Sequence, residues 1–339
     1  MMVCGWQGDT PAESLRVNRH AAELVDDLAV GGVILVGRNA GAPELLRSTI
    51  AELQERAAER GLPPLFVTID QEGGEVSRLI PPHFRTAPEA RRIGDTGDPA
   101  QARAAARMMG EDLRELGINW DFAPVLDVNV NPRNPVIGDR SYGDDPELVA
   151  AMGAAAVRGF QEDAGIMACG KHFPGHGDTD VDSHMALPHI PHAMDRLDRV
   201  ELAPFCAAIS AGLAGIMTSH IMFAALDPEL PATLSPRILT GLLRRRMEFE
   251  GIIITDCLEM KGVADGWGEV DAAVLAVQAG ADMVLCCHTW ATQRAMRDGL
   301  AAAVEDGRIP QSRIDDAIQR IETAKARWVT RNALPAATR

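Results

Sequence analysis

Segment 171–184, with the sequence KHFPGHGDTDVDSH, concentrates the side chains best suited to chemistry. It holds one lysine, three histidines and three aspartates, punctuated by proline and glycine. An apolar run, residues 166–169, directly precedes it. Because α/β proteins place their chemistry at the carboxyl ends of strands, this pattern predicts a strand that opens into a functional loop rather than an ordinary polar surface loop.

Within this loop, Asp182 lies two residues before His184. An aspartate that fixes the tautomer of an imidazole and raises its basicity produces a general acid/base near neutral pH. Asp182 bonding its own backbone in a turn is the alternative. A metal site built from His172, His176, Asp182 and His184 is a less favoured alternative, and we expect neither a metal nor a cofactor.

Polar side chains also end other apolar runs. Asp70 and Asp256 each close a run of apolar residues, and Lys171 with His172 closes the run before the loop. A single aspartate in this position caps the next helix about as often as it faces a pocket. Several such ends on one face of a sheet favour a pocket.

The fold that would gather these ends is an α/β barrel. Eight short apolar runs alternate with amphipathic stretches, and their continuous apolar character is typical of strands buried on both faces. The chain of 339 residues is long enough for such a barrel. We therefore predict a single-domain (β/α)8 barrel over 1–329 with a frayed tail over 330–339, and keep a doubly wound sheet as the alternative. The predicted strands are 2–6, 32–36, 65–70, 119–124, 166–172, 215–220, 252–256 and 282–286.

Start signals mark several of the predicted helices. The pairs Asp98-Pro99, Asp145-Pro146 and Ser235-Pro236 each join an N-cap residue to a proline suited to the first turn. Ser312 is predicted to cap the last helix. No GxGxxG follows a predicted strand and no GxxxxGK[ST] occurs, which argues against dinucleotide and P-loop sites.

Composition excludes several classes of partner. The net charge of −15 disfavours nucleic acid and anionic membranes, because a phosphate backbone demands a basic face. No apolar run reaches 18 residues, and the first ten residues are too short and polar for a signal peptide. The six cysteines show no CxxC pairing and are expected to be reduced. The expected compartment is the cytoplasm.

Several segments together resemble glycoside hydrolase family 3, most of all its single-domain bacterial β-N-acetylglucosaminidases of cell-wall recycling. The KHFPGHG…DSH segment is the most specific, and the order and spacing of the others strengthen the likeness over most of the chain. The other matching segments are GGVILVGRN (31–39), IDQEGGEVSRL (69–79), GINWDFAPVLDVN (117–129), NPVIGDRSYG (134–143), MTSHIMF (217–223) and IIITDCLEM (252–260).

The resemblance implies a TIM-type barrel and a retaining, double-displacement β-N-acetylhexosaminidase acting on terminal β-linked N-acetylglucosamine. Asp256 would be the nucleophile, and His184, polarised by Asp182, the acid/base on a mobile loop. The residues implied to hold the sugar, the small carbohydrate that is the expected partner, are Asp70, Arg78, Arg140, Lys171 and His172. No expectation about oligomeric state follows.

Two departures from the family pattern bear on this reading. Cys257 stands where the family often has a second aspartate after the nucleophile, and the sandwich domain of many family β-glucosidases has no counterpart here. Phosphorolysis, β-glucosidase activity, a metal-dependent hydrolase and a catalytically silent sugar-binding protein stay open as alternatives. A histidine acid/base on a kinked loop also predicts an unliganded separation from Asp256 well above the roughly 5 Å of a retaining carboxylate pair.

Overall fold

The computed structural model describes residues 1–183 and 185–330, and its centre is a closed barrel of eight parallel strands. Around the barrel the order is β1-β10-β9-β7-β5-β4-β3-β2, so the first strand pairs with the last. The bounds are β1 Met2–Cys4, β2 Gly32–Leu35, β3 Phe66–Ile69, β4 Trp120–Asp121, β5 Met167–Phe173, β7 Gly215–Thr218, β9 Ile252–Cys257 and β10 Met283–Cys286. The predicted (β/α)8 barrel is confirmed.

Each of the eight predicted strands is present, with ends shifted by a few residues. The largest difference is β4, predicted over 119–124 but limited to Trp120–Asp121. Beyond Asp121 single hydrogen bonds still join Phe122 N to Ile69 O and Cys169 N to Ala123 O, but Pro124 has no N–H to donate, and the next bridge is an isolated one between Val125 and Lys171.

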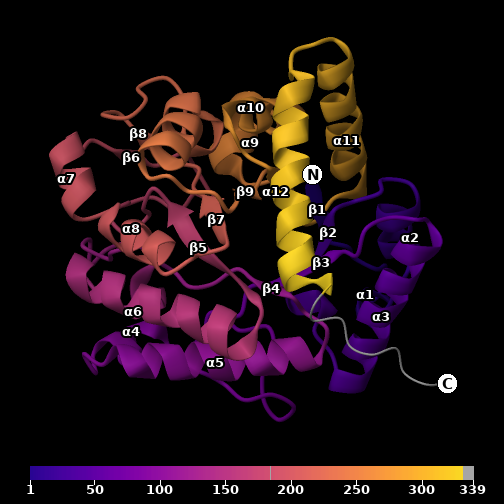
Figure 1. Ribbon diagram of the computed structural model, residues 1–339, viewed down its shortest axis with the longest axis horizontal. Helices are drawn as coiled ribbons and strands as arrows, with labels where there is room; N and C mark the ends of the chain where they lie inside the picture. Colours follow the sequence, from indigo (N-terminus) through magenta and orange to yellow (C-terminus); the bar gives the residue numbers. More distant parts are fainter. Residues whose placement is uncertain (184, 331–339) are drawn as a thin grey trace.

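The helices surround the barrel (Figure 1). They are α1 Pro11–Ser14, α2 Arg19–Asp26, α3 Pro43–Glu59, α4 Ala90–Gly94, α5 Pro99–Glu115, α6 Pro146–Arg158, α7 Met194–Arg199, α8 Ala203–Ser210, α9 Lys261–Trp267, α10 Glu269–Ala279, α11 Trp290–Glu305 and α12 Gln311–Trp328. Tighter or wider helical turns are η1 Gly37–Asn39, η2 Gly138–Arg140, η3 Gly159–Ala164, η4 Ala232–Leu234 and η5 Arg237–Arg246.

Two of the predicted caps are confirmed directly. The side chain of Asp98 accepts from the backbone of α5, and that of Asp145 accepts from the backbone of α6. The hydroxyl of Ser235, which precedes η5, accepts from the backbone N of Ile238 inside η5 at 3.1 Å. The Ser312 prediction is wrong, because α12 begins at Gln311 and its N-cap, Pro310, has no side chain that can accept a hydrogen bond.

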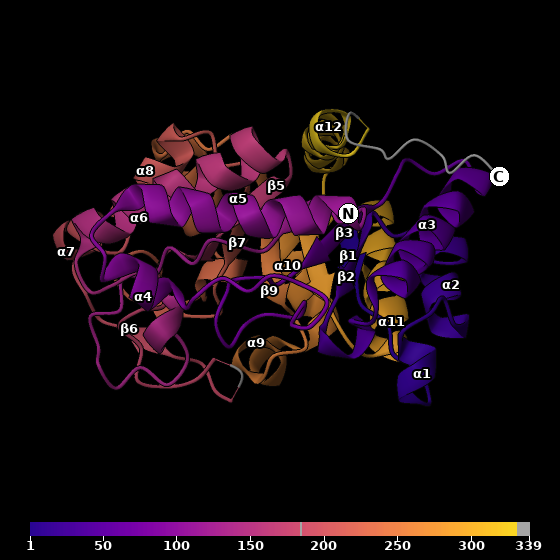
Figure 2. The same cartoon turned by 90° about the horizontal axis from the view of Figure 1, so that it is seen from below.

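The barrel interior forms a hydrophobic cluster of its own, in which strand residues such as Phe66, Trp120 and Met167 pack together. Ile321 and Trp328 of α12 belong to the same cluster. Figure 2 shows α12 crossing one end of the barrel while α9 and the loop carrying β6 lie at the other. Helix α12 therefore closes the end at which the strands begin, and the loops at the opposite end are free to form a site.

A small second sheet was not predicted. It pairs β6 (His189–Ile190) with β8 (Met222–Phe223), two residues from each. Strands this short carry no readable alternation of polar and apolar residues. They join the loop after β5 to the loop after β7, so these two active-end loops are held to each other.

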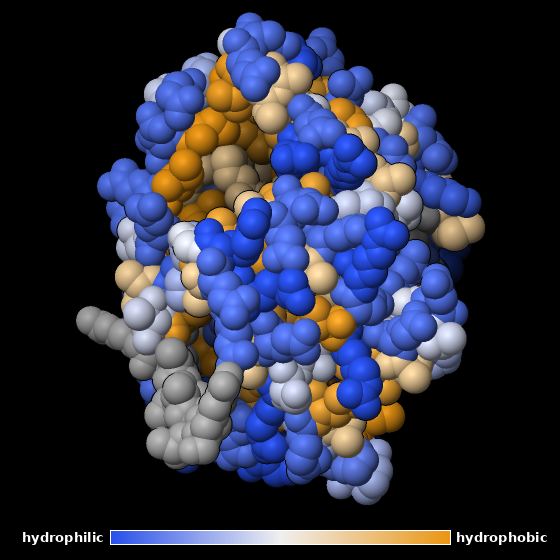
Figure 3. Space-filling view, turned by 90° about the vertical axis from the view of Figure 1, so that its right-hand side faces the viewer, coloured by the Kyte–Doolittle hydropathy of each residue, from blue (hydrophilic) through white to orange (hydrophobic). Residues whose placement is uncertain are grey.

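The surface is mostly polar on the side where α2, α3 and α11 lie. Figure 3 shows hydrophilic residues over most of this face, with apolar residues in a hollow at the upper left and in smaller patches near the centre and at the lower right. Among the described residues, the structure contains no helix with both the length and the apolar character needed to cross a membrane.

Candidate functional site

A cavity of about 670 Å³ opens at the carboxyl ends of the barrel strands. It collects side chains from β2, β5, β7, β9 and β10 and from the loops that follow several of the strands, among them β3 and β4. The predicted site residues that line it are Asp70, Arg78, Arg140, Lys171, His172 and Asp256. Residues separated by up to 186 positions (256 − 70) in the chain thus line one cavity, as expected for a barrel.

Lys171 lies at the bottom of this cavity with its side chain only 2% exposed. Its ammonium Nζ is 2.7 Å from Asp70 Oδ1 and 2.6 Å from Glu72 Oε1. Burial alone would lower the pKa of Lys171, but the two carboxylates raise it above its ordinary value. The lysine is therefore a charged donor held in a fixed position, and its partner Asp70 keeps 21% of its side chain exposed to the cavity.

Glu72 contacts both cations of a buried charged cluster, which consists of Asp70, Glu72, Arg140 and Lys171. The sequence alone did not predict a role for Glu72. Its carboxylate receives two hydrogen bonds from Arg140, at 2.8 and 2.9 Å, besides the contact with Lys171. Burial would raise the pKa of Glu72, yet Lys171 and Arg140 together lower it to about 2. One buried anion therefore balances two buried cations, an arrangement that costs less than leaving either charge unpaired.

The chain after β3 folds back so that these groups meet. Gly73 and Gly74 have φ of +92° and +56°, values that residues with a Cβ rarely adopt. The segment that returns from this turn is held by Gln71, whose side-chain oxygen accepts from Arg78 N at 2.8 Å. The Arg78 guanidinium ends 3.9 Å from Asp70 Oδ2. Glu72 could have been suspected from its place two residues after Asp70, since alternate residues of an extended segment face one side.

His172 is oriented by a second residue that the sequence reading did not single out, Asp127. Asp127 Oδ2 lies 2.7 Å from His172 Nδ1, and its carboxylate also accepts from the backbone N of His172 and of His176. Burial would raise the pKa of Asp127, but His172 and His176 lower it below its ordinary value. With Nδ1 engaged, His172 Nε2 faces Arg140 Nη2 at 3.4 Å.

Asp256 occupies the carboxyl end of β9, a strand paired on both sides inside the barrel. Its Oδ1 accepts from the backbone N of Cys257 at 2.7 Å. Pairing with β10 continues to Cys257, and in the barrel order β9 lies across from β3, the strand that leads into Asp70 and Glu72, so Asp256 faces these residues across the cavity. A carboxylate presented in this way has the geometry of a nucleophile on a rigid support.

The loop after β5 is anchored at its base through His176. His176 Nε2 is 2.9 Å from Ser183 Oγ, and its Nδ1 is 2.9 Å from Thr179 Oγ1. Gly262 N also donates to Ser183 O at 3.1 Å. Burial, reinforced by His172, lowers the pKa of His176 to about 4, so its imidazole is neutral at pH 7. The sequence reading listed His176 only as a possible ligand.

The predicted acid/base pair lies in this same loop. The carbonyl of Asp182 accepts from the backbone N of Met185 and of Ala186, at 2.9 and 3.0 Å. His184 lies outside the described residues. The Asp182–His184 pairing and the distance from His184 to Asp256 therefore stay predictions.

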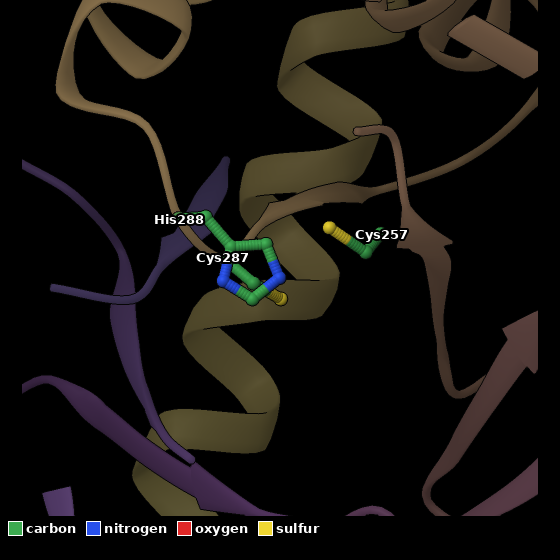
Figure 4. A group of neighbouring side chains, drawn as sticks. All are labelled: Cys257, Cys287 and His288. Atoms are coloured by element: carbon green, nitrogen blue, oxygen red, sulfur yellow. The ribbon is translucent and has the colours of Figure 1, made fainter. Parts of the chain in front are cut away.

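The metal site considered from the sequence receives no support from the described residues. In ranges 1–183 and 185–330, the group of ligand atoms close enough together to hold an ion comes from Cys257, Cys287 and His288. These side chains point toward one another (Figure 4). They lie on the wall of the same cavity but share no member with the set that includes His172 and His176.

Taken together, the cavity offers a fixed carboxylate on one strand and, facing it, a cluster of charged donors and acceptors. Asp70, Arg78, Lys171 and Arg140 provide hydrogen-bonding groups of both polarities, which is the pattern that suits a ligand rich in hydroxyls. A flat hydrophobic pocket would suit an apolar ligand instead.

Comparison with known proteins places this geometry in a family. The model described as "Glycosyl hydrolase family 3 N terminal domain" matches residues 4–324. Beta-hexosaminidase A of Pseudoalteromonas piscicida is 36% identical over 343 residues, covering 94% of this chain and 57% of that protein. A beta-hexosaminidase of Alkalilimnicola ehrlichii is 39% identical over 281 residues, covering 81% of this chain and 79% of that protein.

Solved structures give the same picture. A glycoside hydrolase family 3 β-N-acetylglucosaminidase from a Paenibacillus species superposes with a TM-score of 0.95 at 47% identity, covering 100% of this chain and 63% of that one. A β-N-acetylhexosaminidase from Beutenbergia cavernae has a TM-score of 0.87 at 31% identity, with 96% of each chain covered. The chain thus spans less than two thirds of the Pseudoalteromonas and Paenibacillus proteins. Its sequence and its barrel both show that the chain belongs to glycosyl hydrolase family 3, with residues 4–324 as the family's N-terminal domain.

Proposed function

We propose that this protein is a retaining glycosidase that removes terminal, non-reducing β-linked N-acetylglucosamine from muropeptide-like or chitooligosaccharide substrates. The observation that carries the proposal is the position of Asp256, fixed at the end of β9 and facing the charged cluster across one cavity. The names of its relatives, beta-hexosaminidase and β-N-acetylglucosaminidase, point to the same substrate class.

In the first step, Asp256 attacks the anomeric carbon and forms a covalent glycosyl-enzyme as the bond to the leaving oxygen breaks. Its Oδ1 accepts from Cys257 N, a contact that helps to orient the carboxylate for the attack. In the second step, water attacks the same carbon and releases Asp256. Two inversions give a product with the configuration of the substrate.

The charged cluster holds the sugar in place for this attack. Asp70 accepts from sugar hydroxyls while Lys171 and Arg78 donate to them, because each has a part of its side chain that faces the cavity. The ion pairs of Lys171 exist before any ligand arrives, so binding orders few further side chains. Arg140 and His172 complete the wall next to Glu72.

His184, with Asp182 as its partner, supplies the proton to the leaving oxygen in the first step and removes one from water in the second. This assignment rests on the family resemblance of the DSH sequence, since His184 is outside the described residues. His184 starts as imidazolium, becomes neutral when it gives up its proton in the first step, and is protonated again by the water in the second, so one group serves in both steps.

The first experiment compares release of p-nitrophenol from the β-N-acetylglucosaminide and from the β-glucoside by the wild type and by Asp256→Ala. We expect cleavage of the N-acetylglucosaminide by the wild type and a loss of at least about 10⁴-fold in kcat in the variant. Proton NMR of the first product should show the β-anomer, because the mechanism retains configuration. Full activity in Asp256→Ala, or an α-anomer as first product, would refute the mechanism.

The same assay separates the competing activities. Faster cleavage of the β-glucoside would identify a β-glucosidase, and sugar 1-phosphate formed on addition of phosphate would identify a phosphorylase. Activity abolished by a chelator would point to a metal-dependent hydrolase. Binding of N-acetylglucosamine without turnover of either glycoside would identify a sugar-binding protein.

We also propose that the protein acts in the cytoplasm, where imported cell-wall fragments would be its substrates. Each of the six cysteines is a free thiol in the structure, which accords with a reducing compartment. Fractionation of cells that produce the protein would test this, with recovery outside the cytoplasmic fraction as the contrary result.

A further inference from the structure

The wall of the cavity beside Asp256 carries three groups that the proposed hydrolysis does not use. Cys257 is the last residue of β9, and Cys287 and His288 directly follow β10. One ligand atom from each lies within 4.8 Å of the other two. Figure 4 shows the Cys257 side chain, from the end of β9, turned toward the side chains of Cys287 and His288, from the segment after β10.

The barrel itself brings these groups together. Strands β9 and β10 are parallel neighbours, Cys257 is in register with Leu285, and Leu258 N donates to Leu285 O at 3.0 Å. Cys287 therefore lies just beyond the last residue paired with β9, and its sulfur lies within 4.8 Å of that of Cys257. Both cysteines are largely buried, at 8% and 6% exposure, yet both face the cavity.

The segment that carries Cys287 and His288 is fixed from two sides. Arg38 donates to Cys287 O at 2.6 Å and approaches His288 Nδ1 to 3.1 Å. Glu259 accepts from the backbone N of His288 and of Thr289, at 2.7 and 2.8 Å. The groups are thus held near one another without any ligand, which lowers the entropic cost of binding one.

The chemistry of the set selects a thiophilic cation. Thiolate and imidazole are the ligands that zinc and its heavier relative cadmium prefer, with zinc–sulfur distances of about 2.3 Å and zinc–nitrogen distances of about 2.0 Å. Ligand atoms around such an ion lie roughly 3.5 Å apart. The ligand atoms of the group lie within 4.8 Å of one another, so small rotations of the side chains can bring them to that spacing.

We propose that Cys257 and Cys287, assisted by His288, bind a thiophilic divalent cation in the cavity, and that the bound cation inhibits the enzyme. The two sulfurs are the principal ligands. His288 joins them through Nε2 only when its ring carries the proton on Nδ1, and that tautomer gives up the hydrogen bond from Arg38. Metal binding does not depend on the proposed function, and only the inhibition does.

Inhibition follows because the proposed ligand Cys257 is next to the proposed nucleophile Asp256 in the chain. The backbone N of Cys257 donates to Asp256 Oδ1, so an ion on the Cys257 sulfur lies beside the carboxylate that must attack the sugar. A divalent cation there attracts the lone pairs of Asp256 and occupies space in the cavity. Both effects oppose formation of the glycosyl-enzyme.

The test is a titration of the full chain with Cd²⁺, kept reduced by a phosphine and followed by the ultraviolet thiolate-to-metal charge-transfer band. The wild type should bind about one equivalent of Cd²⁺, with a charge-transfer absorbance that corresponds to two thiolate ligands. Excess Zn²⁺ should displace the bound Cd²⁺. Cys287→Ala should lose the band and weaken binding at least about 100-fold, because one of the principal ligands is gone. Cys257→Ala should do the same.

Cys206→Ala is the matched control, since Cys206 is exposed on α8, outside the set of cavity-lining residues. It should bind Cd²⁺ as the wild type does. Equal affinity and band intensity in the wild type and Cys287→Ala would overturn the proposal, as would the absence of a band in wild type. Circular dichroism checks that each variant is folded.

A second readout is separate from the first. If the wild type cleaves the N-acetylglucosaminide, its inhibition by Cd²⁺ should weaken in Cys287→Ala in parallel with binding. Undiminished inhibition in that variant would refute the inhibitory role. If the wild type cleaves no glycoside, the proposed function fails while the titration still decides whether the site binds metal.

Discussion

At the scale of single residues, the burial of Lys171 and Arg140 side by side depends on Glu72. Its carboxylate contacts both cations and is itself only 4% exposed. We expect Glu72→Gln to lower the free energy of unfolding by about 3 kcal/mol, because two buried cations lose one counterion. We also expect kcat/KM to fall, since Lys171 would shift toward Asp70. Urea denaturation and p-nitrophenol release measure the two effects.

Glu75→Gln provides the control from the same loop, because Glu75 is exposed and removing its charge should change stability by less than about 0.5 kcal/mol. Equal stability of the two variants would mean that the ion pairs of Glu72 contribute nothing net.

The pKa of Glu72 also predicts how this contribution depends on pH. The pKa of Glu72 is about 2 in the folded state and about 4.3 in the unfolded chain. As the pH falls, Glu72 is therefore protonated at a lower pH in the native state than in the unfolded chain. The stabilisation is complete above the unfolded value and is lost as the pH falls from about 5 to about 2. The difference in unfolding free energy between the wild type and Glu72→Gln should therefore shrink over this range. A difference that stays constant from pH 6 to pH 3 would contradict the assignment.

The sequence identified some residues of the site and passed over others for a physical reason. Asp70, Lys171 and Asp256 follow apolar runs directly, so the register of one strand is enough to place them. The role of Glu72 depends on a turn that folds the chain back, and that of Asp127 on contacts with a different strand. Alternation along an extended segment could place Glu72 on the side of Asp70, but the partners of Glu72 and Asp127 come from distant parts of the chain and meet them only when the barrel closes.

At the scale of elements, the loop after β5 is positioned by His176, whose ring holds Ser183 between the predicted pair Asp182 and His184. We expect His176→Ala to lower kcat by about 100-fold on an N-acetylglucosamine disaccharide, because a small displacement of an acid/base group is costly. The p-nitrophenyl substrate should suffer less, since its leaving group departs with little help from an acid. Steady-state kinetics on both substrates measures the contrast.

An equal loss on the two substrates would assign His176 to sugar binding or to the fold rather than to the position of the acid/base loop. Thr179→Val is a milder variant for the same loop, because it removes one of the two contacts of the His176 ring and keeps the other. Its effect should lie between those of the wild type and His176→Ala.

Strands were easier to predict than the details at their ends. A strand buried on both faces must be apolar throughout, and that requirement is visible in the sequence. The two-residue strands β6 and β8 satisfy no such requirement, and they form because two loops happen to meet. The Ser312 cap was misplaced because the preceding Pro310 sets the start of α12 one residue earlier than the serine.

At the scale of the whole molecule, α12 seals the end of the barrel that faces away from the site. Trp328 is 6% exposed and packs with the residues of the barrel interior. We expect Trp328→Ala to cost about 3–5 kcal/mol of stability through the cavity it leaves. The kcat of the folded fraction should be unchanged, because the substituted side chain lies at the opposite end from Asp256.

Ile318→Ala is the control on the same helix. Because Ile318 is 40% exposed, this substitution should lower the free energy of unfolding only slightly. A large fall in kcat for Trp328→Ala below its melting temperature would show that packing at the sealed end is coupled to the cavity.

The pairing of β1 with β10 has a consequence for biosynthesis. Met2, Val3 and Cys4 find their second neighbour only in Val284, Leu285 and Cys286. A nascent chain therefore keeps the outer edge of β1 unpaired until most of the polypeptide has left the ribosome. Such an edge is open to pairing with another chain during that interval. We expect chains arrested before β10 to associate with holdase chaperones, and release to coincide with emergence of the last strand.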